Sequence, residues 1–332
     1  MHPKVSVIMP IYNAETYLSE AIETVLAQTF KDFEFIIVDD QSTDSSRNIV
    51  QSYDDKRILP MSTPRNLGRA GADNYAMRVA KGEYVAKMDS DDISLRTRFE
   101  KQVSFLDENP DINVLGTWSQ NFGASNHLNK YPVEPETAKC KLLCCLPVSN
   151  PSIMMRRELF NQGCRYDDRY RQSEDYDFFV RYINQLTIST IPETLIKYRI
   201  YPSDIKPSIL KDRKASTESI QRALFKEWGL SFTDDEIDLH THISYYDAVA
   251  TEQLLDQIHS WLTKILEHNR RTPWFDQNHL ERFIAEKWFD VCYNLTPKKC
   301  RTSRIYKTSD LSRNMHLSFM SKAKHIIRDV LD

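Results

Sequence analysis

Short apolar runs alternate with amphipathic segments along the first part of this chain, and this alternation restricts the possible folds more than any other feature. The segments 14–28 and 69–80 carry apolar residues at helical spacing, and the hydroxyl and acidic residues of 43–46 predict the start of another helix. The apolar runs predict strands at 5–10, 33–38, 57–61 and 84–88. Strand-helix units of this length predict an α/β fold with a Rossmann-like, mostly parallel sheet flanked by helices.

A polar segment follows each predicted strand. In an open sheet of this kind ligands bind beyond the carboxyl ends of the strands, which meet at one edge. We therefore expect one binding site built from the segments 10–13, 39–42, 64–66 and 89–92.

The segment Asp89-Ser90-Asp91-Asp92 carries three carboxylates within four positions. Oxygen ligands of this kind suit Mg²⁺ or Mn²⁺, and Mg²⁺ is typically held by one or two carboxylates plus the phosphates of a substrate. A metal-diphosphate site is the functional interpretation, and a charged turn with an aspartate as helix cap is the structural alternative. The convergence of four polar segments on one edge favours the metal site.

The few glycines exclude two common phosphate cradles. Only seven occur, and none forms the G-x-G-x-x-G or the G-x-x-x-x-G-K-[ST] pattern. The charge of a phosphate must therefore be met by a metal and by basic side chains. Arg65, Arg69 and Lys87 are candidates, although each is equally well explained as a surface charge.

Length and composition set the remaining limits. A chain of 332 residues predicts one large domain plus a smaller appendage. Its 44 basic and 47 acidic residues give no nucleic-acid signature. The six cysteines form no C-x-x-C framework and no signal peptide precedes Val5, so we expect a cytoplasmic protein in which Cys140 and Cys144 are buried thiols rather than zinc ligands. No stretch is apolar enough to span a membrane.

Five segments of the amino-terminal half, taken together in order and spacing, carry a family resemblance: 5–13, 35–44, 66–74, 82–92 and 98–102. They resemble the inverting nucleotide-sugar glycosyltransferases of family 2, which have the GT-A fold. The match covers roughly the first 110 residues and resumes up to about residue 205. The Asp-x-Asp pattern alone would be a weak signal, whereas the combination is specific.

The resemblance implies a nucleotide-sugar donor, most often UDP-linked, with the base near Pro10, Tyr12 and Asp39 or Asp40. Asp89 would lie by the ribose, Asp91 would reach a divalent metal that bridges the two phosphates, and Asp92 would face the metal or the acceptor. The complete set expected to contact the nucleotide sugar is Pro10, Tyr12, Asn13, Asp39, Asp40, Asn66, Arg69, Asp89, Ser90 and Arg199.

A second acidic segment, 173–177, begins an amphipathic helix. Sugar transfer with inversion needs a carboxylate that takes the proton of the acceptor hydroxyl. Acids at a helix start also complement its dipole, which is the structural alternative. Family members carry their general base in a Glu-Asp pair here, so the resemblance implies Asp175 as the base and Glu174 as a neighbour that contacts the acceptor sugar.

The segment 198–203 resembles a loop that closes over the diphosphate in the family. For Arg199 two roles are open: pairing with phosphate, or an ordinary ion pair with an acidic side chain. Many relatives have His where this chain has Tyr201, and a protonated phenol is a poor ligand for Mg²⁺. The expected metal shell is therefore Asp91, the phosphates and water.

The resemblance ends near residue 207, which we place as the boundary between a GT-A domain at 1–206 and a helical region at 207–332. The aromatic and aliphatic stripes of the helical region predict helix packing, and its helices offer surface for a homodimer. Nine basic residues against one acid between 298 and 328 predict an amphipathic end that lies on an anionic membrane or packs on the helical region.

We therefore expect an inverting, metal-dependent glycosyltransferase (a hexosyltransferase) that moves a sugar from a UDP-sugar to a saccharide acceptor. The acceptor would be a growing, lipid-linked glycan in bacterial capsule, O-antigen or exopolysaccharide assembly, at the inner face of the cell membrane. One alternative is a catalytically silent nucleotide-sugar or glycan-binding module. A sugar nucleotidyltransferase is the other, but it usually has a glycine-rich phosphate loop after its first strand.

Overall fold

The computed structural model describes residues 2–170, 173–202, 207–248, 251–294, 306 and 308–312. The chain forms two compact units: the first comprises Met1–Ala138 and Leu146–Arg213, and the second comprises Lys139–Cys145 and Lys214–Asp332. The sequence predicted a single boundary at residue 207, whereas the first unit of the structure ends a few residues later, at Arg213. The division also differs from the prediction in one further respect. The segment Lys139–Cys145 belongs to the second unit although both its neighbours in sequence belong to the first.

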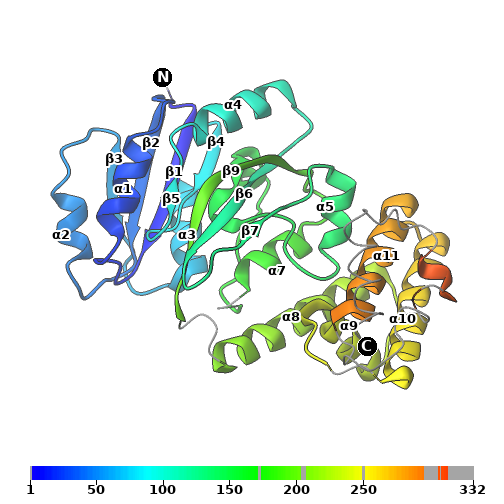
Figure 1. Cartoon of the computed structure of the whole chain (residues 1–332). Coiled ribbons are helices and arrows are strands. Elements are labelled where there is room, and N and C mark those ends of the chain that lie inside the picture. Colours follow the sequence, from blue (N-terminus) through cyan, green and yellow to red (C-terminus); the bar gives the residue numbers. More distant parts are fainter. Residues whose placement is uncertain are drawn as a thin grey trace. The chain divides into compact units, whose positions relative to one another are not determined.

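The strands of the described residues form one nine-stranded sheet, which lies in the first unit (Figure 1). Its order is β3-β2-β1-β4-β8-β6-β9-β5, with β7 paired to β6. The strands are β1 (Val5–Ile11), β2 (Phe33–Asp39), β3 (Ile58–Ser62), β4 (Tyr84–Lys87), β5 (Ile93–Ser94), β6 (Val114–Gly123), β7 (Leu128–Asn129), β8 (Met154–Arg156) and β9 (Ile188–Ile200).

The four strands predicted from the apolar runs are neighbours and run parallel. β1 pairs with β2 and β4, and β2 pairs with β3, all in parallel register. Their carboxyl ends therefore meet at one edge, as the sequence predicts. β8 is antiparallel to both β4 and β6, so the complete sheet is mixed. The expected GT-A-like α/β fold is confirmed.

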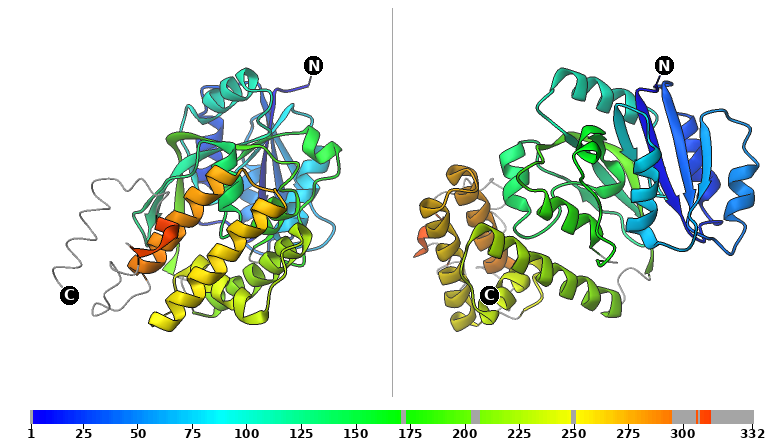
Figure 2. Two further views of the ribbon diagram at one scale, coloured as in Figure 1. Left: turned by 90° about the vertical axis from the view of Figure 1, so that its right-hand side faces the viewer. Right: turned by 180° about the vertical axis from the view of Figure 1, so that it is seen from behind.

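Helices flank the sheet because their apolar residues recur at helical spacing. α1 (Leu18–Leu26) buries Leu18, Ala21, Ile22 and Val25. α1 and α2 (Ser46–Gln51) cover one face of the parallel strands and α3 (Gly68–Val79) covers the other, as right-handed crossovers require (Figure 2). The other helices of this unit are α4 (Arg98–Glu108), α6 (Glu158–Asn161), α7 (Glu174–Arg181) and the short η1 (Asn150–Ser152); α5 (Pro135–Lys141) begins in it.

One glycine allows β4 to approach β1. A Cβ added at Gly82 would lie 2.4 Å from the backbone nitrogen of Ser6 and 2.7 Å from the carbonyl carbon of Val5. No other residue fits this contact without moving the backbone. Gly82 thereby helps to set the strand that carries Asp89 at its end.

The part of the second unit that the structure describes is helical: α8 (Pro207–Trp228), which begins in the first unit, α9 (Asp234–Tyr245), α10 (Glu252–Arg271), α11 (Gln277–Asn294) and the short η3 (Asp310–Ser312). The apolar stripes are core, as predicted, because Ile220, Leu224, Trp228, Ile258, Leu262 and Trp288 are all buried. α8 ends before Gly229, which has a φ of 75°, and the side chain of Thr233 caps α9.

His240 is a buried histidine inside the second unit. Its Nδ1 accepts a hydrogen bond from Trp261 Nε1 at 3.1 Å, and its Nε2 donates to the carbonyl of Leu143 at 2.7 Å. Burial lowers the pKa of His240 from 6.5 to about 4. The neutral ring is therefore the folded form, with its proton on Nε2.

The second unit is therefore expected to lose stability on acidification. Unfolded His240 takes up a proton below pH 6.5 and the folded residue does so only near pH 4, so the loss begins below pH 6.5 and reaches roughly 3 kcal/mol near pH 4. Urea unfolding at several pH values, followed by tryptophan fluorescence, measures this loss. His240→Gln is expected to flatten the pH dependence and the exposed His127→Gln to leave it unchanged; an equal slope in both variants would contradict the assignment.

The basic carboxyl-terminal segment lies almost entirely outside the described residues, so its predicted membrane helix stays a prediction. Within the parts of the chain that the structure describes, no helix is long and apolar enough to cross a membrane.

Candidate active site

The turn after β4 carries Asp89, Asp91 and Asp92, and a buried arginine fixes its backbone. Arg98 on α4 donates from Nη2 to the carbonyl of Lys87 at 2.8 Å and to that of Ile153 at 3.3 Å. Burial lowers the pKa of Arg98 to about 9, while the charges of Asp92 and Asp89 favour the cation. The segment 98–102 was part of the family resemblance, but its sequence gave no sign that Arg98 supports the acidic turn.

Asp89 pairs with an arginine that also lies close to Glu174. Its Oδ2 accepts a hydrogen bond from Arg69 Nη2 at 2.9 Å, and Arg69 Nη1 lies 3.9 Å from Glu174 Oε1. The Asp89 charge raises the pKa of Arg69 well above its usual value, so this guanidinium is permanently charged. Arg69 therefore joins the ends of β4 and α7 from its position on α3.

Asp91 is held by two residues from the end of β9. Tyr201 donates its hydroxyl proton to Asp91 Oδ2 at 2.8 Å, and Arg199 Nε donates to the Asp91 carbonyl at 2.8 Å. Burial raises the pKa of Tyr201, so the phenol stays protonated and acts as a donor. Tyr201 thus contacts the predicted metal ligand, Asp91, through a hydrogen bond.

Arg199 has its guanidinium engaged within the protein. It makes an ion pair with Glu20 at 2.7 Å and lies 3.7 Å from the centre of the Tyr17 ring and 4.3 Å from that of Phe122. The side chain is only 12 % exposed. Of the two roles that the sequence left open, this geometry favours the acidic partner over a phosphate.

Asp92 is buried directly beside the turn. It is 1 % exposed, and its Oδ1 accepts a hydrogen bond from the backbone nitrogen of Arg199 at 2.8 Å. Its Oδ2 has no hydrogen-bond partner among the described residues. Burial and the charge of Asp89 raise the pKa of Asp92 well above its usual range.

Asp40 organises the loop between β3 and α3. Its carboxylate accepts hydrogen bonds from the backbone nitrogens of Leu67 and Gly68, both at 2.8 Å, and from Thr63 Oγ1 at 2.7 Å. Asn66 Nδ2 donates to the Asp40 carbonyl at 3.0 Å. Gly68 has a φ of 72°, which glycine adopts without strain. This network holds the start of α3, where Arg69 emerges.

Asp39 lines a cavity of about 190 Å³ together with apolar side chains of Ile11, Ile37 and Met61. Its Oδ1 accepts from the backbone nitrogen of Ser42 at 3.0 Å, and its Oδ2 lies 3.4 Å from Arg47 Nε without a hydrogen bond. The cavity therefore offers an acceptor oxygen beside an apolar slot.

The remaining predicted donor residues lie along the same edge. Tyr12 is 54 % exposed, an unusual state for a large aromatic side chain. Asn13 adopts a φ of 50° and ties two loops together, because its Oδ1 accepts from the backbone nitrogen of Thr43 at 2.8 Å. Pro10 and Ser90 are half-buried at the ends of β1 and β4.

Glu174 and Asp175 occupy the first turn of α7, as the sequence predicts. Glu174 is 4 % exposed, and burial together with the charge of Asp175 raises its pKa to about 7. Burial also raises the pKa of Asp175, whose Oδ1 accepts from the backbone nitrogen of Tyr176 at 2.8 Å. Carboxyl groups with raised pKa values in a cleft are suited to general acid-base catalysis.

Lys87 does not face the site, so the suggestion that it meets a phosphate is wrong. It is 1 % exposed and forms an ion pair with the fully buried Asp73 on α3. Its ammonium also lies 4.6 Å from the centre of the Tyr166 ring. Lys87 is neither a surface charge nor a phosphate ligand but part of the packing beneath the site.

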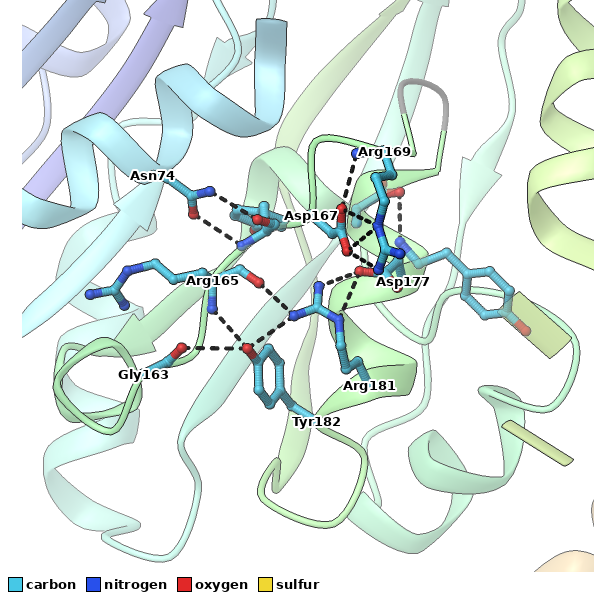
Figure 3. A network of polar contacts seen from close by, with 11 residues as sticks. Asn74, Gly163, Arg165, Asp167, Arg169, Asp177, Arg181 and Tyr182 are labelled. Carbon is cyan, nitrogen blue, oxygen red and sulfur yellow. Dashed lines mark hydrogen bonds and ion pairs between the residues drawn. The ribbon is translucent and has the colours of Figure 1, made fainter. Parts of the chain in front are cut away.

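A loop at 163–170 forms a further wall that sequence reasoning missed (Figure 3). Its residues Asp168 and Tyr170 line a cavity of about 570 Å³ with Arg65, Arg69 and Glu174. Nothing local in the loop sequence indicates binding. Its only signal was its position shortly before the acidic segment 173–177.

The mixed α/β sheet has the GT-A fold, with acidic residues at the end of β4 and a buried carboxylate pair at the start of α7. A profile described as Glycosyl transferase family 2 matches residues 6–163. An uncharacterized glycosyltransferase of Methanocaldococcus jannaschii is 38% identical over 223 residues, an alignment that covers 64% of this chain and 76% of the relative.

Two further proteins are similar. WfgD of Escherichia coli, a UDP-Glc:alpha-D-GlcNAc-diphosphoundecaprenol beta-1,3-glucosyltransferase, is 31% identical, with 63% of this chain and 82% of WfgD covered. The crystal structure of Staphylococcus aureus TarS 1-349 superposes with a TM-score of 0.58 at 20% identity and covers 98% of this chain and 89% of that chain, which supports the fold. The chain belongs to glycosyltransferase family 2, and the expectation that it is an enzyme of this class is confirmed.

Proposed function

We propose that this protein is an inverting, metal-dependent glycosyltransferase that moves a sugar from a UDP-sugar to a saccharide acceptor in the assembly of a bacterial cell-surface polysaccharide. The observation that carries the proposal is the single ion-pair chain from Asp89 through Arg69 to Glu174. The Arg69 guanidinium contacts both Asp89, the predicted donor residue, and Glu174, the predicted acceptor residue. A transferase needs its two substrates at this proximity.

The nucleobase is assigned to the cavity beside Asp39. A flat base fits against the apolar side chains, and an imide N–H, as in uracil, donates to Asp39 Oδ2, which has an ion pair with Arg47 but no hydrogen bond among the described residues. The exposed Tyr12 ring is assigned as the stacking surface for the base. Asp89 is assigned to the ribose hydroxyls, with Arg69 holding its carboxylate.

Asp91 is the residue proposed to hold a Mg²⁺ or Mn²⁺ ion, with Asp92 behind it. Among the described residues no group of three or more His, Cys, Asp or Glu side chains could hold a metal ion. The available carboxylates therefore fit an ion that takes one or two protein ligands and completes its shell with phosphates and water. Such an ion would supply positive charge for the leaving diphosphate.

Asp175 is proposed as the general base. It removes the proton from an acceptor hydroxyl while that oxygen bonds to the anomeric carbon and the bond to the diphosphate breaks. The attack comes from the face opposite the diphosphate, so the configuration inverts. Burial, which raises the pKa of Asp175, strengthens it as a base relative to an exposed aspartate.

The name of one relative supports the proposed acceptor class. WfgD, by its name, glucosylates a sugar linked to diphosphoundecaprenol. A lipid-linked saccharide is therefore the acceptor that we propose for this chain as well. A silent binding module is disfavoured because every acidic residue of the proposed mechanism is present.

Donor turnover tests the proposal. With Mn²⁺, a panel of UDP-, GDP- and dTDP-sugars is expected to give slow hydrolysis of one UDP-sugar, and Asp91→Ala is expected to lower it at least about 100-fold because the leaving diphosphate loses its counter-charge. The exposed Asp111→Asn serves as control. Full metal-dependent turnover of Asp91→Ala, or no turnover of any nucleotide sugar by the wild type, would overturn the proposal.

A further inference from the structure

The cavity beside α7 has polar groups that the proposed mechanism leaves unused. It measures about 570 Å³ and is lined by Arg65, Arg69, Asp168, Tyr170 and Glu174. This volume lies in the range of roughly 300–1,000 Å³ that is typical of small-molecule sites. All five side chains belong to the first unit, so the cavity is a feature of that unit alone.

The loop that contributes Asp168 and Tyr170 is firmly anchored (Figure 3). Asn74 on α3 pairs with the Tyr166 backbone, donating to its carbonyl at 2.9 Å and accepting from its nitrogen at 3.0 Å. Arg181 Nη1 donates to the Arg165 carbonyl at 3.0 Å. The Tyr182 hydroxyl accepts from the Arg165 nitrogen at 3.1 Å. The loop therefore keeps its shape without help from a ligand.

The anchoring does not use the groups that face the cavity. Asp167 turns to Arg169: its carboxylate accepts from Arg169 Nε at 2.9 and 3.0 Å, from Nη2 at 2.6 Å and from the backbone nitrogen at 3.0 Å. Asp168 next to it has no hydrogen bond or ion pair with any described residue, and neither has Arg65 on the opposite wall. A carboxylate and a guanidinium are thus left for a ligand on a preformed frame.

The cavity lies at the border between the predicted donor and acceptor residues. Asp168, Tyr170 and Glu174 line one part of it, and Asn66 and Arg69, which are expected to contact the nucleotide sugar, line another. Arg69 forms the border, because it pairs with Asp89 on one side and Glu174 on the other. A sugar bound by Asp168 and Glu174 would lie beside the residue next to the proposed base, Asp175.

The charges of the lining favour an uncharged sugar. Two guanidinium groups are matched by two carboxylates, and Arg69 is already paired. An acidic sugar would meet Asp168 and Glu174 without a surplus of positive charge. A neutral sugar instead offers hydroxyls to Asp168 and Arg65 and an apolar ring face to Tyr170.

We propose that Asp168 and Tyr170 form an acceptor subsite that selects a neutral sugar residue at the growing end of the glycan. This inference rests on the proposed function and extends it to residues that neither the sequence pattern nor the family resemblance singled out. Asp168 binds sugar hydroxyls and Tyr170 contacts the ring face. Glu174 and Arg69 close the subsite toward the donor.

Steady-state kinetics with Mn²⁺ and the UDP-sugar selected by the donor screen test the subsite. The acceptors are p-nitrophenyl glycosides of neutral hexoses and of glucuronic acid. Asp168→Asn and Tyr170→Ala are each expected to raise the acceptor KM about tenfold or more, because a charged hydrogen bond or a stacking surface is lost, while the donor KM stays within a factor of about two. Asp111→Asn, the same change at an exposed site, is the control.

The outcomes separate the subsite from the function on which it rests. An unchanged acceptor KM in both variants, with transfer intact, overturns the subsite alone. A wild-type preference for the glucuronide overturns the selection of a neutral sugar. Failure of the wild type to turn over any nucleotide sugar overturns the proposed function instead.

Discussion

Asp175→Asn is expected to lower the turnover number for sugar transfer by about 10²–10⁴, the usual contribution of a positioned general base. An amide of the same shape keeps the hydrogen bond from the Tyr176 backbone to the side-chain oxygen, so the start of α7 stays in place. What is lost is the capacity to accept the acceptor's proton. Donor affinity, measured by titration with UDP, is expected to stay within a few fold.

The pH profile distinguishes this chemical role from a structural one. The base must be unprotonated, so kcat/KM of the wild type falls as the pH decreases through the raised pKa of Asp175. This acid limb lies above the ordinary aspartate value of 3.8. The limb is expected to disappear in Asp175→Asn and to persist in Asp111→Asn. Transfer by Asp175→Asn at the wild-type rate would show that another group is the base.

Lys87→Met is expected to destabilise the first unit by about 3–5 kcal/mol, because it leaves the buried carboxylate of Asp73 without its cation. Asp73 Oδ1 already lacks a hydrogen-bond partner among the described residues. Burial by itself lowers the pKa of Lys87, but the charges of Asp73, Tyr166 and Asp89 and the hydrogen bond to Asp73 together outweigh it, so the net shift is upward and the lysine is charged. Urea unfolding followed by hydrogen exchange of the β1 and β4 amides measures the loss.

Two comparison variants make this result specific. Lys101→Met removes a lysine whose ion pair with Glu193 is exposed, and is expected to cost at most about 1 kcal/mol. The double variant Lys87→Met, Asp73→Leu replaces both charges by apolar groups and is expected to recover most of the loss. Equal stability of the Lys87→Met and Lys101→Met proteins would refute the interpretation.

The sequence was sufficient for features that depend on local pattern. Buried parallel strands read as continuous apolar runs, so β1, β2 and β4 were predicted within one residue of their bounds. Once the strands are parallel, their order along one edge brings Asp39 and Asp89 together. The start of α7 could also be predicted from local sequence, because acidic residues preceded an apolar face at helical spacing.

Side-chain roles that depend on distant partners could not be predicted in this way. Arg199 is separated by 179 residues from Glu20, the carboxylate with which it pairs. Nothing in the local sequence distinguishes Lys87 and Asp73 from ordinary surface charges. Only packing on both faces of the sheet buries them. Asp40 looked like a ligand of the base, yet it binds two backbone nitrogens of the loop before α3.

The sequence by itself therefore determined the parallel strands, the edge at which the acidic segments meet and the family. The tertiary structure decided which charges are buried, which are paired and which remain free to meet a ligand. The physical reason is that strand and helix formation follow from neighbours a few positions away. Burial, pKa and cavity shape depend instead on segments about a hundred residues apart, such as Asn74 and the Tyr166 backbone that it holds.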